Sequence, residues 1–323
     1  MSIVGQQDQY NHETGNPIEV DIQVDLDWLL QSQPLMLATP TVSLFIPQDI
    51  TVEPKVAMNC LVTYPAQPAY RLGKHFEDCV EHLFNASKNN HIIARNLVIQ
   101  TPQRTLGELD LIYRNSASEV VHLELSIKFY LLTKGGSRLE DFIGPAGRDR
   151  LDLKWDRLRQ HQLPLSHTEQ VLDFLQQQCL PLPSHRQLLL TGILFYAYEN
   201  WHSTTVKDIG VDPNHQRGWW LEHHELEQIK PIEGLERGFI ILPKWHWIGG
   251  PRHYSDPVPI NHETLIQLTT ADSWPNMVLV YERAYPLHTH HSHDIGAADH
   301  LLEPWVFKHR GLVLATKKPP LVA

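Results

Sequence analysis

The sequence predicts an α/β fold in which helices flank a mixed β-sheet. Apolar residues recur at helical spacing from Arg71 onward, and three strand-like runs follow between residues 91 and 130. After two more helical segments, a continuous apolar run covers residues 187–198. The order is therefore α-β-β-β-α-β with one extra helix inserted, and such alternation favours a sheet covered by helices.

Length and composition indicate the domain organisation. The chain has 323 residues, 42% of them hydrophobic and 20% charged, which gives enough apolar surface for a core and too little charge bias for disorder. Because cores beyond about 250 residues tend to divide, we expect two domains. A polar tail and proline-punctuated connector at 1–69 precede the α/β core at 70–198. A smaller α+β region rich in Trp and His follows at 199–323.

The N-terminal residues and the cysteines favour a soluble, cytoplasmic protein. The first residues are polar and lack the basic and apolar parts of a signal peptide, and no run approaches the roughly 20 apolar residues of a membrane span. Cys60, Cys79 and Cys179 lie far apart and lack CxxC spacing, so we expect neither a disulfide framework nor a zinc knot. A reducing compartment without a membrane partner fits this pattern.

The charge distribution limits how the chain could contact nucleic acid. Its net charge of −10 argues against coating a duplex, because that affinity comes from Lys and Arg neutralising phosphates. Contact with DNA or RNA must therefore be local. Residues 128–159 offer a region for it, with eight Lys or Arg against five Asp or Glu.

The first predicted elements are a short helix at 24–30, the helix from Arg71 and three strands. The apolar stripe of the helix from Arg71 consists of Leu72, Phe76, Val80, Leu83 and Phe84, with Glu77 one step round. The strands are expected at 91–100, 107–114 and 120–130. Because strand side chains alternate, one face of the third carries His122, Glu124, Ser126, Lys128 and Tyr130.

The later elements complete the predicted core. A helix from about Asp149 to Gln162 has Asp149 as its N-cap and Leu151, Trp155 and Leu158 as its apolar stripe. Its neighbouring face, Arg150, Lys154, Arg157 and His161, is either a solvated surface or a phosphate track. A polar helix at 168–178 and the buried strand at 187–198 follow. Strand-like runs at 238–244 and 276–283 lie in the C-terminal region.

Acidic residues gather on consecutive strands of this core. Glu108 and Asp110 share one strand face, and the next strand carries Glu124, Ser126 and Lys128 on a single face. Hydrolysis of a phosphodiester with Mg²⁺ needs clustered carboxylates for the hard cation and a positive group near the phosphate. Two neighbouring strands could bring Asp110 and Glu124 within reach of one metal ion. The polar row is otherwise the solvated face of an antiparallel sheet.

Four ordered stretches, LGKHFEDCVEHLF, RNLVIQ, GELDLIYR and VVHLELSIKFYL, resemble the YraN-type proteins and the archaeal Holliday-junction resolvases. The resemblance spans residues 72–130 and implies a PD-(D/E)XK, restriction-endonuclease-like core of αβββαβ order. Over its whole length, including FIGPAGRDRLDLKWDRLRQHQL and RGWW, the chain resembles a bacterial family called domain of unknown function 1853.

The resemblance implies roles for individual residues. Gly73 and Glu77 match the helix motif, Asp110 matches the central metal-binding aspartate, and Lys128 matches the lysine that orients the attacking water. Mg²⁺, or Mn²⁺ in its place, is the implied cofactor. The sequence departs from the pattern at Ser126, where an acid is expected, and Glu124 lies about 6.6 Å earlier along the strand. We take Glu77, Asp110 and Glu124 as metal ligands, with Glu108, Ser126, Lys154 and Gln162 around them.

Three functional readings remain open at this level. The first is a Mg²⁺-dependent nuclease that acts on DNA or RNA. The second is an inactive nuclease fold that binds nucleic acid or protein, which Ser126 and the acidic net charge favour. The third is a structural partner protein that uses the Trp-rich C-terminal region.

Two aromatic and imidazole sets are less specific. The histidines His288, His290, His291, His293 and His300, with Asp294, could chelate a metal, but a flexible His-rich loop is the better interpretation. The tryptophans could stack on bases, although core packing is their commoner use. This set comprises Trp219, Trp220, Trp245, Trp247, Trp274 and Trp305.

Overall fold

The structure is a computed structural model of the chain. It describes residues 18–51, 60–64, 71–102, 104–133, 135, 138–250, 258–270, 275–284 and 304–314. The predicted histidine cluster and Trp274 lie outside the described residues. Among the described residues, no helix is long and apolar enough to cross a membrane.

A mixed sheet of ten strands organises the fold, in the order β10-β11-β12-β9-β8-β6-β5-β4, with β2 beside β8 and β7 beside β6. Its strands are β2 (Ser43–Leu44), β4 (His91–Gln100), β5 (Thr105–Arg114), β6 (Val120–Leu132), β7 (Phe142–Ile143), β8 (His185–Ala197), β9 (Gln216–Glu222), β10 (Leu235–Leu242), β11 (Asn276–Ala284) and β12 (Val306–Leu314). Pairing is antiparallel from β4 to β6 and from β10 to β12, and parallel where β8 meets β6 and β9. The predicted mixed α/β class is confirmed. A separate two-stranded sheet pairs β1 (Ile18–Asp21) with β3 (Leu61–Tyr64).

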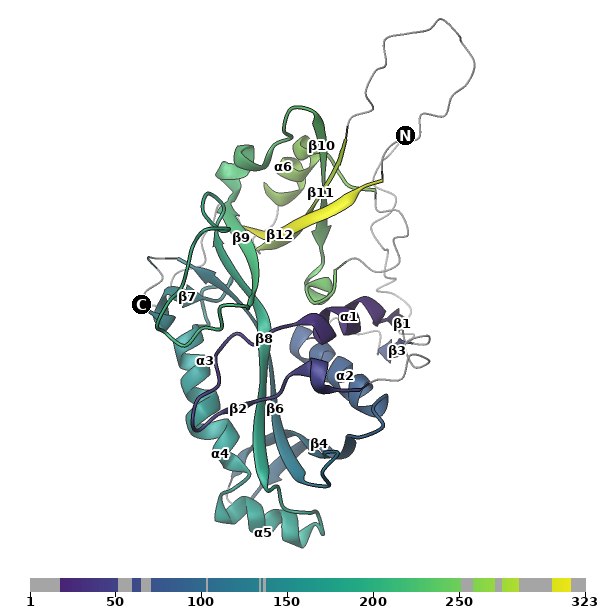
Figure 1. Ribbon diagram of the computed structural model, residues 1–323, viewed down its shortest axis with the longest axis vertical. Coiled ribbons are helices and arrows are strands. Elements are labelled where there is room, and N and C mark those ends of the chain that lie inside the picture. Colours follow the sequence, from purple (N-terminus) through teal and green to yellow (C-terminus); the bar gives the residue numbers. More distant parts are fainter. Residues whose placement is uncertain are drawn as a thin grey trace, which may run out of the picture.

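Helices cover both faces of the long central strands β6 and β8 (Figure 1). On one face lie α1 (Gln23–Gln31) and α2 (Leu72–Asn85). On the other lie α3 (Leu151–Arg157), the π-helical turn Leu158–Gln162 and α4 (Leu163–Leu165). Further along the chain come α5 (Glu169–Gln177) and α6 (His262–Thr270).

Alternation along the strands divides the core between these two helical layers. Leu123 of β6 points to the α2 layer, whereas Tyr130 points to the α3 layer. The stripe predicted for the helix from Arg71 is buried as expected, with Phe76 and Phe84 almost fully enclosed. This arrangement places the row from His122 to Lys128 on the α3 side of the sheet.

Residues outside the predicted 70–198 core contribute to the same packing. Leu29 from the N-terminal segment and Leu279 from the C-terminal region belong to the apolar cluster around α2. The sheet also runs on past residue 199, because β8 pairs with β9. Trp219 and Trp247 are buried, so these two members of the tryptophan set pack in the interior.

The helix predicted from Asp149 begins later and changes its pitch. Its N-cap is Arg150 rather than Asp149, whose carboxylate is engaged elsewhere, so the predicted cap is wrong. The segment predicted as one helix to Gln162 is α-helical only to Arg157 and then makes a π-helical turn. Such turns insert an extra residue and are frequent at functional sites.

A fork between β5 and β6 positions the acidic residues. The two strands pair only from Leu111↔Leu123 to Arg114↔Val120. Beyond that point β5 continues against β4, while β6 continues against β8. Asp110 and Glu124 are the first residues past the last paired position, so they stand at the point where the sheet opens.

Candidate functional site: a carboxylate pair at the sheet fork

Asp110 and Glu124 face each other across the fork. The register Leu111↔Leu123 continues to Asp110 opposite Glu124, and directly opposite residues project from the same face. The Leu125 amide, which has lost β5 as its neighbour, donates to Asp110 Oδ2 at 2.8 Å. The charge of Glu124 acts on Asp110. The fork thus holds two carboxyl groups close together.

The Glu124 carboxyl is held from two further sides. His122 Nε2 lies 3.0 Å from Oε1, and Gln162 Nε2 donates to Oε2 at 2.8 Å. Glu124 and His122 are completely buried. Because its two oxygens are already oriented by fixed partners, Glu124 cannot rotate freely, and its remaining lone pairs have fixed directions.

Burial dominates the electrostatics of the pair. Burial, and then the charge of Glu124, raise the pKa of Asp110 to about 7. Burial raises the pKa of Glu124 to about 7 as well, against the opposing effects of Lys154 and Gln162. Burial lowers the pKa of His122 to about 4, so its imidazole is neutral near pH 7. Both carboxyl groups ionise with difficulty, and a cation bound between them would stabilise their charged forms.

Glu77 lies on α2, on the other side of the sheet from the row that carries Glu124, and within the described residues its carboxylate does not cluster with Asp110 and Glu124. Its charge contributes to the raised pKa of Asp110, which places it within electrostatic range. Asn96 Nδ2 donates to Glu77 Oε2 at 2.8 Å, and Lys74 Nζ lies 3.5 Å from the same oxygen. Asn96 has a φ of 48°, in the left-handed region that non-glycine residues rarely adopt. Asn96, the residue that orients the Glu77 carboxylate, therefore has an unusual backbone conformation.

The two candidate lysines differ in their partners. Lys128 Nζ donates to Asp149 Oδ2 at 2.7 Å, in an ion pair between β6 and the segment before α3. Lys154 Nζ donates instead to Gln162 Oε1 at 3.0 Å. Burial, and then the charge of Lys128, lower the pKa of Lys154. Lys154 is therefore linked to Glu124 through one amide.

The remaining predicted residues lie around the pair. Ser126 is buried on β6, one step past Glu124 on the same face. Glu108 is exposed on β5, and its charge adds to the raised pKa of Glu124. Sequence reasoning gave no role to His122, Asn96 or Asp149. His122 stood in the predicted polar row, whereas no pattern in the sequence marked Asn96.

The donor set of the site fits a hard divalent cation. The carboxylate oxygens of Asp110 and Glu124 are ligands that Mg²⁺ and Mn²⁺ prefer, and Mg²⁺ characteristically uses few carboxylates and keeps several waters. Asp110 is partly exposed, whereas Glu124 is completely buried, and Glu77 would contact such an ion through one of its waters.

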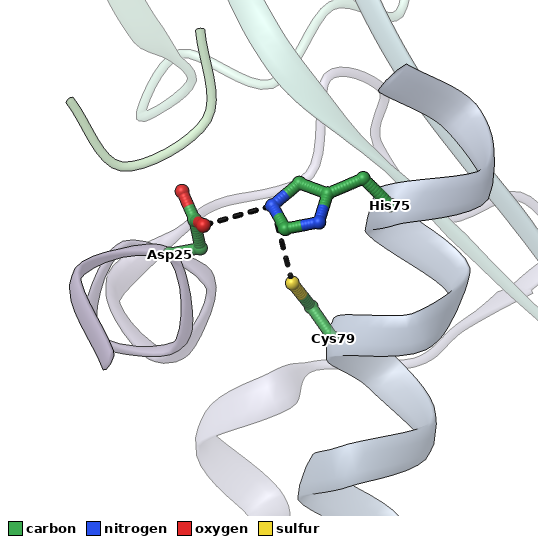
Figure 2. Close-up of side chains that lie close together, drawn as sticks. All are labelled: Asp25, His75 and Cys79. Atoms are coloured by element: carbon green, nitrogen blue, oxygen red, sulfur yellow. Dashed lines mark hydrogen bonds and ion pairs between the residues drawn. The ribbon is translucent and has the colours of Figure 1, made fainter. Parts of the chain in front are cut away.

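A second cluster, made by Asp25, His75 and Cys79, lies fully buried between α1 and α2 (Figure 2). His75 Nε2 is 2.8 Å from Asp25 Oδ2 and 3.7 Å from Cys79 Sγ. These donors are close enough for one transition-metal ion. However, the Gly249 amide donates to Asp25 Oδ1 at 2.8 Å, and the Arg310 guanidinium of β12 interacts with the Asp25 charge. We interpret the cluster as a buried polar network that joins α1 and α2 to the C-terminal part of the sheet.

Fold and site define a mixed α/β protein with a buried carboxylate pair at a fork in its sheet. The family model for a domain of unknown function, DUF1853, matches residues 24–293, and the chain belongs to this family. Comparison with curated proteins and with solved structures found no match.

Proposed function

We propose that the chain has a PD-(D/E)XK nuclease-like core and acts as a Mg²⁺-dependent phosphodiesterase on DNA or RNA. The observation that carries the proposal is the meeting of Asp110 and Glu124 where β5 and β6 separate, with Glu77 in electrostatic range. Glu77 and Asp110 match the metal ligands that resemblance to the YraN-type proteins and the archaeal resolvases implied, and Glu124 takes the place of the acid that the pattern puts at residue 126.

The proposed fold also accounts for the departure at Ser126. Glu124, rather than residue 126, is the β6 position opposite Asp110 in the extended register. In this proposal Glu124 serves as the strand's metal ligand, and Ser126 is a neighbour that needs no carboxylate.

The side chains would divide the work of hydrolysis as follows. Asp110, Glu124 and Glu77 would hold the cation, which supplies charge stabilisation at the phosphate and lowers the pKa of bound water. His122 and Gln162 keep the Glu124 carboxyl oriented, and the Leu125 amide does the same for Asp110. A positive side chain would neutralise charge on the phosphate.

A cytoplasmic location is part of the same proposal. The three cysteines, which are an odd number and lack CxxC spacing, support it.

The test is cleavage by the full chain of supercoiled plasmid, circular single-stranded DNA and total RNA, with Mg²⁺, Mn²⁺ or a chelator. The variants are Asp110→Asn and Glu124→Gln, with Asp173→Asn as a matched control on the exposed face of α5. Cation-dependent cleavage lost in the first two variants and kept in the control supports the proposal. Wild-type protein that binds nucleic acid without cutting any of the three would overturn it and favour an inactive binding module.

A further inference from the structure

Two lysines lie near the carboxylate pair, close enough to each other for the charge of Lys128 to act on Lys154, and they differ in what holds their ammonium groups. Lys128 is four residues past Glu124 on β6, which corresponds to about 13 Å along a strand. Its Nζ is also held by Asp149 at 2.7 Å. To act at the fork, Lys128 would have to leave this ion pair and reach back along the strand.

Lys154 reaches the pair from α3, the helical layer that covers the face on which Glu124 lies. Its Nζ donates to Gln162 Oε1 at 3.0 Å, and the other end of the same amide donates to Glu124 Oε2 at 2.8 Å. The charges of both Glu124 and Asp110 act on Lys154. The ammonium group is therefore one side-chain amide away from a proposed metal ligand.

The π-helical turn aligns the two ends of this bridge more closely. An α-helix has 3.6 residues per turn, so residues eight apart point about 80° away from each other around the axis. The turn at Leu158–Gln162 closes with one more residue and brings Gln162 back to the side of Lys154. In a regular helix the two side chains would lie on the same broad face but less closely aligned.

We propose that Lys154, positioned by Gln162, is the lysine that contacts the reacting phosphate at the Asp110–Glu124 pair, and that Lys128 fixes the segment before α3 through Asp149. This inference rests on the proposed function. In the reaction, the water oxygen bonds to phosphorus, the bond to the leaving oxygen breaks, and the proton of the water passes through solvent to the leaving group. Lys154 stays protonated and donates to a non-bridging phosphate oxygen.

The arrangement makes Gln162 a positioning residue. Its amide can accept from Lys154 and donate to Glu124 at once, which neither a carboxylate nor an apolar side chain can do. Gln162→Glu would place a third acid beside Glu124, and Gln162→Leu would release both partners. Both variants should impair cleavage, and Gln162→Glu should also change the pH profile because it adds a titrating group.

The experiment compares Lys154→Met, Lys154→Arg and Lys128→Met in the full chain. Three quantities are measured for each: the midpoint of thermal unfolding, the Mn²⁺ affinity by calorimetry, and kcat for the substrate that wild-type protein cuts. We expect Lys154→Met to bind Mn²⁺ at least as tightly as wild type while kcat falls about 100-fold, the scale of losing one charge-stabilising donor. Lys154→Arg should recover part of this loss. Lys128→Met should lower the unfolding midpoint and leave kcat within about threefold.

The opposite pattern, with kcat lost in Lys128→Met and kept in Lys154→Met, would overturn the assignment while leaving the proposed function intact. An inactive wild-type protein would instead refute the proposed function, and the assignment with it.

Discussion

Cation binding at the Asp110–Glu124 pair should depend on pH in a range where ordinary carboxylates no longer titrate. Burial raises the pKa of each acid to about 7, so each is substantially protonated at pH 6 and ionised at pH 8. A cation must displace whatever protons remain. Affinity should therefore rise with pH through this window and level off above pH 8.

The size of the effect follows from the proton competition. For one group with a pKa of about 7, the ionised fraction, and hence the affinity, increases about tenfold between pH 6 and pH 8. If both acids must ionise, the increase approaches about 100-fold. Carboxyl groups with the usual pKa near 4 would give almost no change in cation affinity between pH 6 and pH 8.

Calorimetric titration with Mn²⁺ at pH 6, 7 and 8 and constant ionic strength measures this directly. Repeating the pH 7 titration in buffers of different ionisation enthalpy counts the protons released. Asp110→Asn should bind more weakly and show a smaller pH dependence, whereas Asp173→Asn should behave as wild type. Affinity that is flat from pH 6 to 8, or unchanged in Asp110→Asn, would refute the reasoning.

Three further outcomes are expected. Asp110→Asn should stabilise the cation-free protein at pH 8 and not at pH 3.5, because a carboxyl group with a raised pKa lowers the free energy of unfolding as pH rises from about 4 to 7. The upper limit of this gain is about 4 kcal/mol, and urea unfolding at both pH values measures it. Gly192→Ala should cost more than about 2 kcal/mol, since φ is 141° and a Cβ would collide with the Lys128 carbonyl oxygen, and a stable variant would contradict the close approach of β8 to β6. Asp25→Ala should cost about 1 to 3 kcal/mol, because it removes the buried carboxylate that accepts from the Gly249 amide and contacts His75. In contrast, a chelator should leave wild-type unfolding unchanged, and a chelator-induced loss of stability would make the Asp25 cluster a metal site.

Local periodicity predicted the helices and strands that form the core. The alternation in the third strand placed His122, Glu124, Ser126 and Lys128 on one face, and that strand is β6, Val120–Leu132. The predicted strand at 91–100 coincides with β4. These elements have long, regular apolar patterns, which single-sequence reasoning reads best.

Pairing between strands that are distant in the sequence could not be predicted from local sequence patterns. The strands β9 and β12 were not predicted, because their pairing joins residues far apart in the sequence, such as Trp219 and Gly311. The C-terminal region was expected as a smaller α+β region packed on the core, and its strands extend the same sheet.

The contacts within the candidate site could not be predicted either, because they join residues far apart in the sequence. Alignment by motif assigned the lysine role to Lys128, but its partner Asp149 had been assigned to a helix cap. The link from Lys154 through Gln162 to Glu124 includes a π-helical turn, and no spacing in the sequence indicates one. The fork that brings Asp110 opposite Glu124 likewise follows from how the strands separate.

Anomalous diffraction from a crystal of the protein soaked in Mn²⁺ tests the central claim most directly. The account predicts an anomalous peak bound by the carboxylates of Asp110 and Glu124, with Glu77 beside it, and loss of that peak in Asp110→Asn. A peak only at Asp25, or none at the fork with Mn²⁺ in excess, would contradict it.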